Sequence, residues 1–511
     1  MLIISASWLL VNRLEAQTLE EAMIAIERED FKKAETVLQK LLNDSPKKPE
    51  LYYYMGLNYL GQADEAMDED NDVVSQKKYL EKAKGYFEQG VNASSKYALN
   101  YAGLGSYNLQ STKDFGEAKK NLDKALELGE DNVKILLAVA EFYNQSRVGN
   151  SINEATLLLT KVITKDPKNP DALTALGDNW LEQNVYETAV EYYKKALVIN
   201  PKLAKAHYMM GIALLKDKKK NEAAAAFEEA IVQDGNLGPA YRHLAKLYYD
   251  IGMFEESKNL YKKYVTMTEN DPRARMLYIN ALYLAKDYAN AIVEIQNALG
   301  DKTLQEQNKP ALYRMLGYSN YELGTKNQDS TKIIAAKEAM DMYFKIVPAD
   351  KIISKDYEYY GKILSGRGLY AEAASNLEKA VGQDPKLTNL FEMIGNNYNI
   401  LKQYDKAAEW YKKAVEAYPK NAANFFYYGR VLKNLNNYAL ADSMFRRTLE
   451  INKNIPEVYK EAAFVNTKMD TADSFGKARP YYEKFIEITS DKADKYKSEI
   501  FTAHYYLCTH Y

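Results

Sequence analysis

The sequence predicts an all-α protein built as a solenoid of stacked helical hairpins, and three observations lead to this fold class. Residues of the same kind recur every 34 positions, as Gly177 with Gly211 and Ala189 with Ala223 do. Within each unit the apolar residues are spaced three and four apart, which is typical of one face of a helix. The 511 residues contain no alternating apolar and polar stretch long enough to build a sheet.

The unit that begins at Pro170 illustrates how each pair of helices is expected to form. The apolar face of its first helix consists of Leu173, Leu176, Gly177 and Trp180. The matching face of its second helix consists of Ala189, Tyr193 and Ala196. Pro201 ends the second helix, because proline cannot continue the hydrogen-bond pattern. Such a hairpin buries its apolar faces only by stacking on neighbouring hairpins, which predicts a superhelix with a continuous core.

The same register explains why the chain contains as many as 44 tyrosines. Tyr193, Tyr261 and Tyr411 occupy the large position between the helices of their units. We expect a tyrosine there to bury its ring and to keep its hydroxyl near solvent.

Taken in register, these residues resemble the tetratricopeptide repeat, whose pattern is W-x2-L-G-x2-Y, then A-x3-F, then P. The resemblance extends from about Glu15 to Tyr511. It implies a right-handed superhelical solenoid of about thirteen tetratricopeptide-type hairpins plus a C-terminal helix. The chain also resembles exported bacterial tetratricopeptide scaffold proteins.

Insertions subdivide the expected array. Extra residues lie near 61–76, 146–150 and 324–331, where they form loops or longer helices. The expected segments are N-terminal units with insertions at 17–169, uninterrupted units at 170–303, one unit with an insertion at 304–353, C-terminal units at 354–490 and a capping helix at 491–511.

Residues 1–16 are expected to form a signal peptide. The apolar run MLIISASWLLV is too short to cross a bilayer as a helix but has the length of a signal-peptide core. The small Ala16 before Gln17 is the expected cleavage point. Export to the periplasm follows from cleavage, whereas an intact Met1 favours the cytoplasm.

Composition excludes several classes of protein. The 68 basic and 70 acidic residues give a net charge of −2, unlike the strongly basic face of a nucleic-acid-binding protein. A single cysteine, Cys508, excludes an intrachain disulfide framework and a multi-cysteine metal site. The repeats leave no block for a catalytic domain, so we expect no enzyme, no catalytic residues and no cofactor.

Two clusters contain metal-binding residue types, and neither matches a metal site. An aspartate series at 68–72 begins like an EF-hand loop, but the loop's glycine and glutamate are missing from their required positions. His504, Cys508 and His510 lack a fourth ligand for a structural zinc site. We therefore expect no bound metal.

The resemblance implies that the first helices of the units line a concave groove that binds protein segments. Groove-facing residues are expected at the second, fifth, ninth and twelfth places of each unit. In three successive units the expected partner-binding residues are Arg242, Lys246, Tyr249, Arg273, Met276, Asn280, Tyr283, Arg314, Tyr318 and Tyr321. Arginine pairs with carboxylates and stacks on rings, which favours partner segments with acidic or aromatic residues. The neighbouring His243 is expected to be an ordinary surface histidine.

The resulting prediction is a non-catalytic scaffold that binds protein partners in the groove and works in a bacterial envelope assembly. The alternative is a cytoplasmic regulatory or cargo-binding adaptor. A noncatalytic part of a larger system, with its enzyme on another chain, remains a third class. Nucleic acid, small-molecule substrates and integration into a membrane are not expected.

Overall fold

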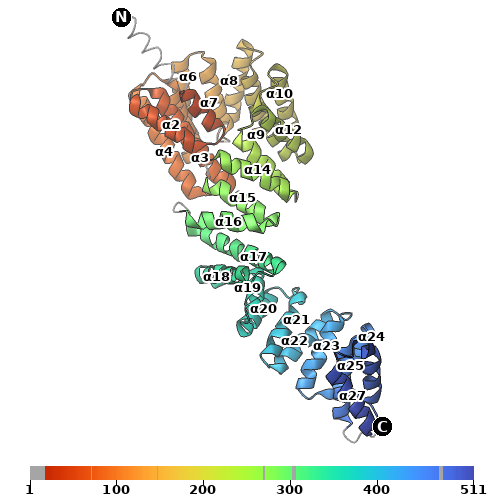
Figure 1. Cartoon of the computed structure of the whole chain (residues 1–511). Helices are drawn as coiled ribbons and strands as arrows, with labels where there is room; N and C mark the ends of the chain where they lie inside the picture. The colour runs from red at the N-terminus through yellow and green to blue at the C-terminus, as the bar shows by residue number, and fades with distance from the viewer. Residues whose placement is uncertain are drawn as a thin grey trace, which may run out of the picture. The chain divides into compact units, whose positions relative to one another are not determined.

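The computed structural model describes residues 18–70, 72–146, 148–268, 271–301, 306–470 and 476–510, which are almost entirely helical (Figure 1). No strand occurs within these ranges. The expected signal peptide at residues 1–16 lies outside the described residues. None of the described helices is both long and apolar enough to cross a bilayer.

The chain divides into two compact units, the first ending at Asp287 and the second beginning at Tyr288. The helices of the first unit are 18–27, α2 (Phe31–Asp44), α3 (Pro49–Asp70), α4 (Val73–Ala93), α5 (Ala98–Tyr107), α6 (Phe115–Gly129), α7 (Val133–Asn144), α8 (Ser151–Lys165), α9 (Pro170–Glu182), α10 (Tyr186–Ile199), α11 (Ala204–Lys216), α12 (Lys220–Gln233), α13 (Gly238–Asp250), α14 (Phe254–Met267) and α15 (Pro272–Leu284). A short π-helix, η1 (Asn108–Thr112), extends α5.

The helices of the second unit are α16 (Tyr288–Gly300), α17 (Lys309–Asn327), α18 (Ser330–Ile346), α19 (Ser354–Gly366), α20 (Tyr370–Gln383), α21 (Phe391–Ile400), α22 (Tyr404–Ala417), α23 (Ala422–Asn434), α24 (Tyr438–Ile451), α25 (Pro456–Met469), α26 (Arg479–Thr489) and α27 (Lys497–His510). Single 3₁₀ turns are η2 (Glu306–Asn308), η3 (Ala349–Lys351), η4 (Thr388–Leu390) and η5 (Ser490–Lys492). The order of the described helices is that of thirteen helix pairs followed by one last helix. The predicted all-α superhelical repeat fold is confirmed.

Two backbone features repeat with the 34-residue period. A Cβ atom at Gly177 would lie 2.4 Å from the Tyr193 ring, so glycine is needed where the two helices of that hairpin cross. The turn between the two helices contains a residue with a positive φ angle. Such left-handed residues include Asn184, Lys218, Gly252 and Lys286, each 34 positions after the last. This conformation ends the first helix and directs the chain into the second.

The hydroxyl of Tyr193 differs from the prediction. Tyr193 is completely buried, and its hydroxyl donates to the carboxylate of Asp178 at 2.7 Å rather than lying near solvent. Tyr59, Tyr248 and Tyr398 likewise donate to glutamates of the preceding hairpin. A buried hydroxyl needs a partner, and a nearby carboxylate supplies one inside the stack.

The insertions mostly lengthen helices. The residues near 61–76 extend α3 to 22 residues and α4 to 21. Those near 324–331 extend α17 to 19 residues and α18 to 17. The residues between α7 and α8 stay a short connection. The boundary between the compact units coincides with none of these insertions, and the sequence-based segments remain a prediction.

Candidate partner-binding surface

The predicted groove residues of the first unit lie on α13 and α15, the first helices of successive repeats. Lys246 is exposed on α13, and Tyr249 beside it is partly exposed. On α15, Met276, Asn280 and Tyr283 are partly exposed. These five side chains are the accessible residues of the predicted patch in this unit other than its arginines.

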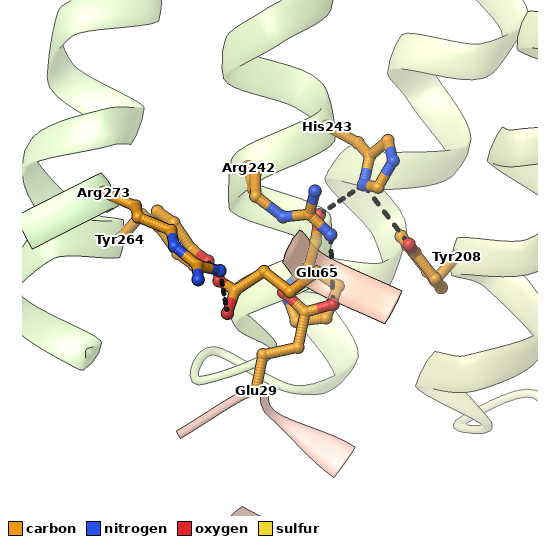
Figure 2. A network of polar contacts seen from close by, with 8 residues as sticks. Glu29, Glu65, Tyr208, Arg242, His243, Tyr264 and Arg273 are labelled. Carbon is orange, nitrogen blue, oxygen red and sulfur yellow. Dashed lines mark hydrogen bonds and ion pairs between the residues drawn. The ribbon is translucent and has the colours of Figure 1, made fainter. Parts of the chain in front are cut away.

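Arg242 on α13 is buried by another part of the first unit. Its guanidinium lies 3.0 Å from a carboxylate oxygen of Glu29, in the turn between helix 18–27 and α2. The Arg242 and Glu29 side chains are only 6% and 19% exposed. Figure 2 shows the Glu29 side chain directed toward Arg242. The pair joins residues 213 positions apart.

Arg273, in the first turn of α15, also meets a carboxylate from the N-terminal region. Its Nη1 lies 3.4 Å from Glu65, in the part of α3 that the insertion adds (Figure 2). Tyr264 on α14 donates its hydroxyl to the other oxygen of Glu65, also at 3.4 Å. The long α3 thus reaches α14 and α15, and the ribbons of α3 and α14 come together in Figure 1.

A third contact fixes the same turn. Arg28 donates to both carboxylate oxygens of Asp234, at 2.9 and 3.0 Å, an arrangement that fits the planar guanidinium. The backbone of this turn approaches α13 so closely that a Cβ atom at Gly238 would lie 2.6 Å from the Arg28 carbonyl oxygen. We call the contacts Arg28–Asp234, Glu29–Arg242 and Glu65 with Tyr264 and Arg273 the closing contacts, since they join the start of the first unit to its last helices.

The charge of Glu65 is poorly accommodated in this network. Burial is the main cause that raises the pKa of the Glu65 carboxyl to about 7, and the nearby carboxylates of Glu29 and Asp271 contribute to the rise. The positive charges of Arg273 and Arg242 lower the pKa of Glu65, but by less than burial and the carboxylates raise it. The carboxyl of Glu65 is therefore partly protonated near neutral pH, as expected for an acid removed from water.

His243 was expected at the surface, and this expectation is wrong. Its ring packs against the rings of Tyr208 and Phe227, and its Nδ1 lies 3.0 Å from the Pro239 carbonyl oxygen and 3.2 Å from the Tyr208 hydroxyl (Figure 2). Burial, together with the neighbouring charge of Arg242, lowers the pKa of His243 to about 3. The imidazole is neutral and structural.

In the second unit, the predicted residues Arg314 and Tyr318 belong to a buried network around Asp356. Asp356 is fully buried; Arg314 lies 2.9 Å from one of its carboxylate oxygens as an ion pair and donates a hydrogen bond to the other at 3.1 Å. Tyr318 and Tyr343 donate their hydroxyls to the same carboxylate at 2.5 and 2.7 Å. Tyr321 is partly exposed, with its ring edge-on to that of Tyr359.

The second unit also exposes aromatic and basic side chains on α23 and α25. Phe464 is 41% exposed and lies near two ammonium groups, of Lys433 and Lys468, at 5.2 and 5.6 Å from its ring centre. The Arg430 side chain on α23 is half exposed. Phe464 and Arg430 hold the ninth place of their units, one of the places expected to face the groove. A cation beside an exposed ring is suited to acidic and aromatic groups.

The residues that sequence reasoning missed are the acidic partners Glu29, Glu65 and Asp356. The three predicted arginines each have one of these carboxylates within 3.4 Å. Whether the ten predicted residues bind a partner remains a prediction. The geometry adds that their arginines already have carboxylate partners within the chain.

The described residues contain no cluster of three or more His, Cys, Asp or Glu side chains placed to hold a metal ion. Asp72 instead caps α4 by accepting from the Ser75 amide at 3.0 Å. The side chains at 68–70 and of His510 lie outside the described residues.

The fold and this surface define the class of the molecule, an all-α repeat protein. Polar and aromatic side chains are accessible on the first helix of several of its repeats. Comparison with protein families identifies the repeat. Residues 242–302 and 361–422 match the tetratricopeptide repeat, and residues 149–230 match the family described as anaphase-promoting complex, cyclosome, subunit 3. These matches show that the chain contains tetratricopeptide repeats. Proteins of this kind bind protein partners and are generally not catalytic.

Curated relatives are distant. The chain is 22% identical to superkiller complex protein 3 of Mus musculus over 59% of this chain and 19% of that protein. It is 24% identical to a TPR repeat-containing protein of Methanocaldococcus jannaschii over 75% of this chain and 69% of that protein. It is 22% identical to lipopolysaccharide assembly protein B of Escherichia coli K12 over 47% of this chain and 61% of that protein.

The chain spans only 19% of the length of superkiller complex protein 3 and 33% of the length of another curated relative, the Sol locus transcriptional repressor of Clostridium acetobutylicum. Among solved structures, the C-terminal part of a TPR repeat-containing protein from Cytophaga hutchinsonii is 29% identical. That match covers 46% of this chain and 86% of the other, with a TM-score of 0.38.

Proposed function

We propose that the protein is a non-catalytic scaffold that binds partner protein segments on the concave face of its repeats. The observation that carries this proposal is the row of accessible side chains on α13 and α15: Lys246, Tyr249, Met276, Asn280 and Tyr283. They combine one cation, two aromatic rings, an amide and an adaptable thioether on successive first helices. This mixture is common at protein interfaces, where Tyr and Met are enriched.

The three arginines of the predicted patch are not among the accessible side chains on which this proposal rests. Arg242, Arg273 and Arg314 have carboxylate partners in the chain, so their replacement changes internal contacts as well as any interface. In the second unit, Tyr321 and the exposed Phe464 with its lysines are further candidate positions for binding a partner. Acidic and aromatic partner segments fit both groups of side chains.

A charge change at the accessible positions tests this function. We expect the double variant Lys246→Glu/Met276→Glu to lose most of the partner captured from a native extract, identified by mass spectrometry. The matched control is Lys262→Glu, an exposed lysine on the neighbouring α14. Equal capture by wild type, patch variant and control, with unchanged helicity by circular dichroism, would remove this surface from consideration.

We place the scaffold in a bacterial envelope assembly. The apolar run at the N-terminus and the similarity to a protein named for lipopolysaccharide assembly support this placement. The alternative is a cytoplasmic adaptor. N-terminal sequencing of the mature protein separates them, because export predicts a chain that begins at Gln17.

A further inference from the structure

The closing contacts place acidic side chains where the proposed function expects a partner. Glu29 and Glu65 lie against Arg242 and Arg273, the two arginines of the predicted patch in the first unit. These carboxylates come from the first two hairpins, roughly 200 residues away along the chain. The first two hairpins thus provide, from within the chain, the same carboxylate groups that an acidic segment of a partner protein would provide.

The N-terminal turn also faces charged groups further along the inner face of the first unit. Glu27, directly before the closing contacts, is influenced by Lys205, Glu141, Asp171 and Asp234. Lys205 binds Glu141 at 2.9 Å while its side chain stays about half exposed. The turn therefore lies over charged side chains, and polar contacts help to hold it there.

We propose that the first two hairpins are an intrachain competitor for Arg242 and Arg273, and that an acidic protein segment displaces them. This proposal rests on the proposed partner-binding function and adds its partner class and its regulation. When the first two hairpins are docked, Arg242 is held by Glu29 in the turn and Arg273 by Glu65 on α3. When they are displaced, both guanidinium groups join Lys246 on the accessible face and meet the carboxylates of the partner.

Gly238 offers a way to open the turn without changing any charge. An added Cβ atom would lie 2.6 Å from the Arg28 carbonyl oxygen, so Gly238→Ala forces the turn away from α13. Gly235→Ala is the matched control, because its Cβ would have only one neighbour, at 3.9 Å. Glu29→Gln opens the turn by a second route, through loss of the charged pair with Arg242.

Hydrogen–deuterium exchange measures the opening. We expect residues 18–44 to exchange about tenfold faster in Gly238→Ala and in Glu29→Gln than in wild type, while α9–α12 exchange as before, because the change is a local opening. Gly235→Ala should match wild type. Unchanged exchange in both opening variants, with intact helicity, would overturn the proposal.

Fluorescence anisotropy with a labelled poly-glutamate peptide of 20 residues then measures the competition. We expect Gly238→Ala to bind this probe about tenfold more tightly than wild type, within the usual range of coupling between two sites. The triple variant Gly238→Ala/Arg242→Gln/Arg273→Gln opens the turn equally but should show no gain. Equal affinity of wild type and Gly238→Ala, or an equal gain in the triple variant, would overturn the competition.

The outcomes separate this proposal from the proposed function. If the Lys246→Glu/Met276→Glu variant loses partner capture while Gly238→Ala leaves exchange and probe binding unchanged, the surface binds partners without an intrachain competitor. If the opening variants gain affinity for poly-glutamate but the patch variant still captures its partners, the competitor exists and the native partners bind elsewhere.

Discussion

The two compact units use the same chemical pairing, arginine with a buried carboxylate, over different ranges of the chain. In the second unit, Asp356 joins Arg314, 42 residues away, and so links neighbouring hairpins. In the first unit, Glu29 joins Arg242 across 213 residues. The first kind of pair stabilises the stacking of adjacent repeats, whereas the second holds the beginning of a superhelical turn against its end. One is part of the core, and the other is the contact that we propose to open while the repeats stay folded.

The largest effect on stability is expected from the network around Asp356. Asp356→Ala would leave Arg314 and the hydroxyls of Tyr318 and Tyr343 without their shared carboxylate. We expect the free energy of unfolding of the second unit to fall by about 3–5 kcal/mol, the usual cost of removing one partner of a buried pair. Denaturant titration measures it, with the exposed Asp350→Ala as control. A loss as small as that of the control would contradict the stabilising role of this network.

A pH dependence is expected next, and it belongs to the first unit. The pKa of Glu65 on α3 is raised from 4.5 to about 7 in the folded protein, so its burial becomes increasingly costly as the pH rises from about 4.5 to about 7 and stays costly above that. The groups that face it are Glu29, Asp271, Arg273, Arg242 and Tyr264. At about 1.4 kcal/mol per pKa unit, the full effect reaches about 3 kcal/mol.

The variant Glu65→Gln isolates this effect, because it mimics the protonated carboxyl at every pH. Wild type and variant should have similar unfolding free energies at pH 5, and wild type should become the less stable of the two by pH 8. Thermal and denaturant unfolding at both pH values provide the measurement. A stability difference that does not change with pH would show that Glu65 stays charged when docked.

A smaller effect is expected at the Arg28–Asp234 pair. The two side chains are 33% and 25% exposed, so solvent screens part of their attraction. We expect Arg28→Ala to weaken docking of the turn by about 1 kcal/mol. Exchange of residues 18–44 should rise, with no change around Asp356. A matching rise in the second unit would indicate general destabilisation rather than opening of the turn.

The smallest effect is expected at a surface pair of the second unit. Arg447 and Glu450 lie 2.6 Å apart on α24, with side chains 49% and 61% exposed. Arg447→Ala should change the free energy of unfolding by less than about 0.5 kcal/mol. This variant calibrates the others, since a larger loss would mean that exposed pairs matter more here than the comparison of the two units assumes.

The fold was predictable because its signals are local. Gly177 and Tyr193 are only 16 positions apart, and their contact follows from the geometry of one hairpin that recurs through the chain. The insertion near 61–76 was also visible as an interruption of the period. Its consequence, a longer α3 that carries Glu65 to α14 and α15, depends on the rotation accumulated over several repeats. No short stretch of sequence contains that information.

The candidate surface was only partly predictable for the same reason. Counting places within a unit located Lys246, Met276 and Tyr283 on accessible faces of first helices. It could not reveal that Arg242 is buried, since its partner Glu29 lies in a turn six repeats earlier. His243 was misjudged because its neighbour Tyr208 belongs to the preceding repeat, where the hydrogen bond had no counterpart in the consensus pattern.

The left-handed turn residues have a consequence for engineering. Lys218, Lys286 and Lys402 hold a conformation that costs less for glycine than for any side chain with a Cβ atom. Glycine at these three positions should therefore make the array more heat-resistant without altering its inner face. Glu29 adopts the same conformation, but its carboxylate is one of the groups that dock the turn. A thermostabilising programme that treated all such turns alike would remove the proposed control element along with the strain.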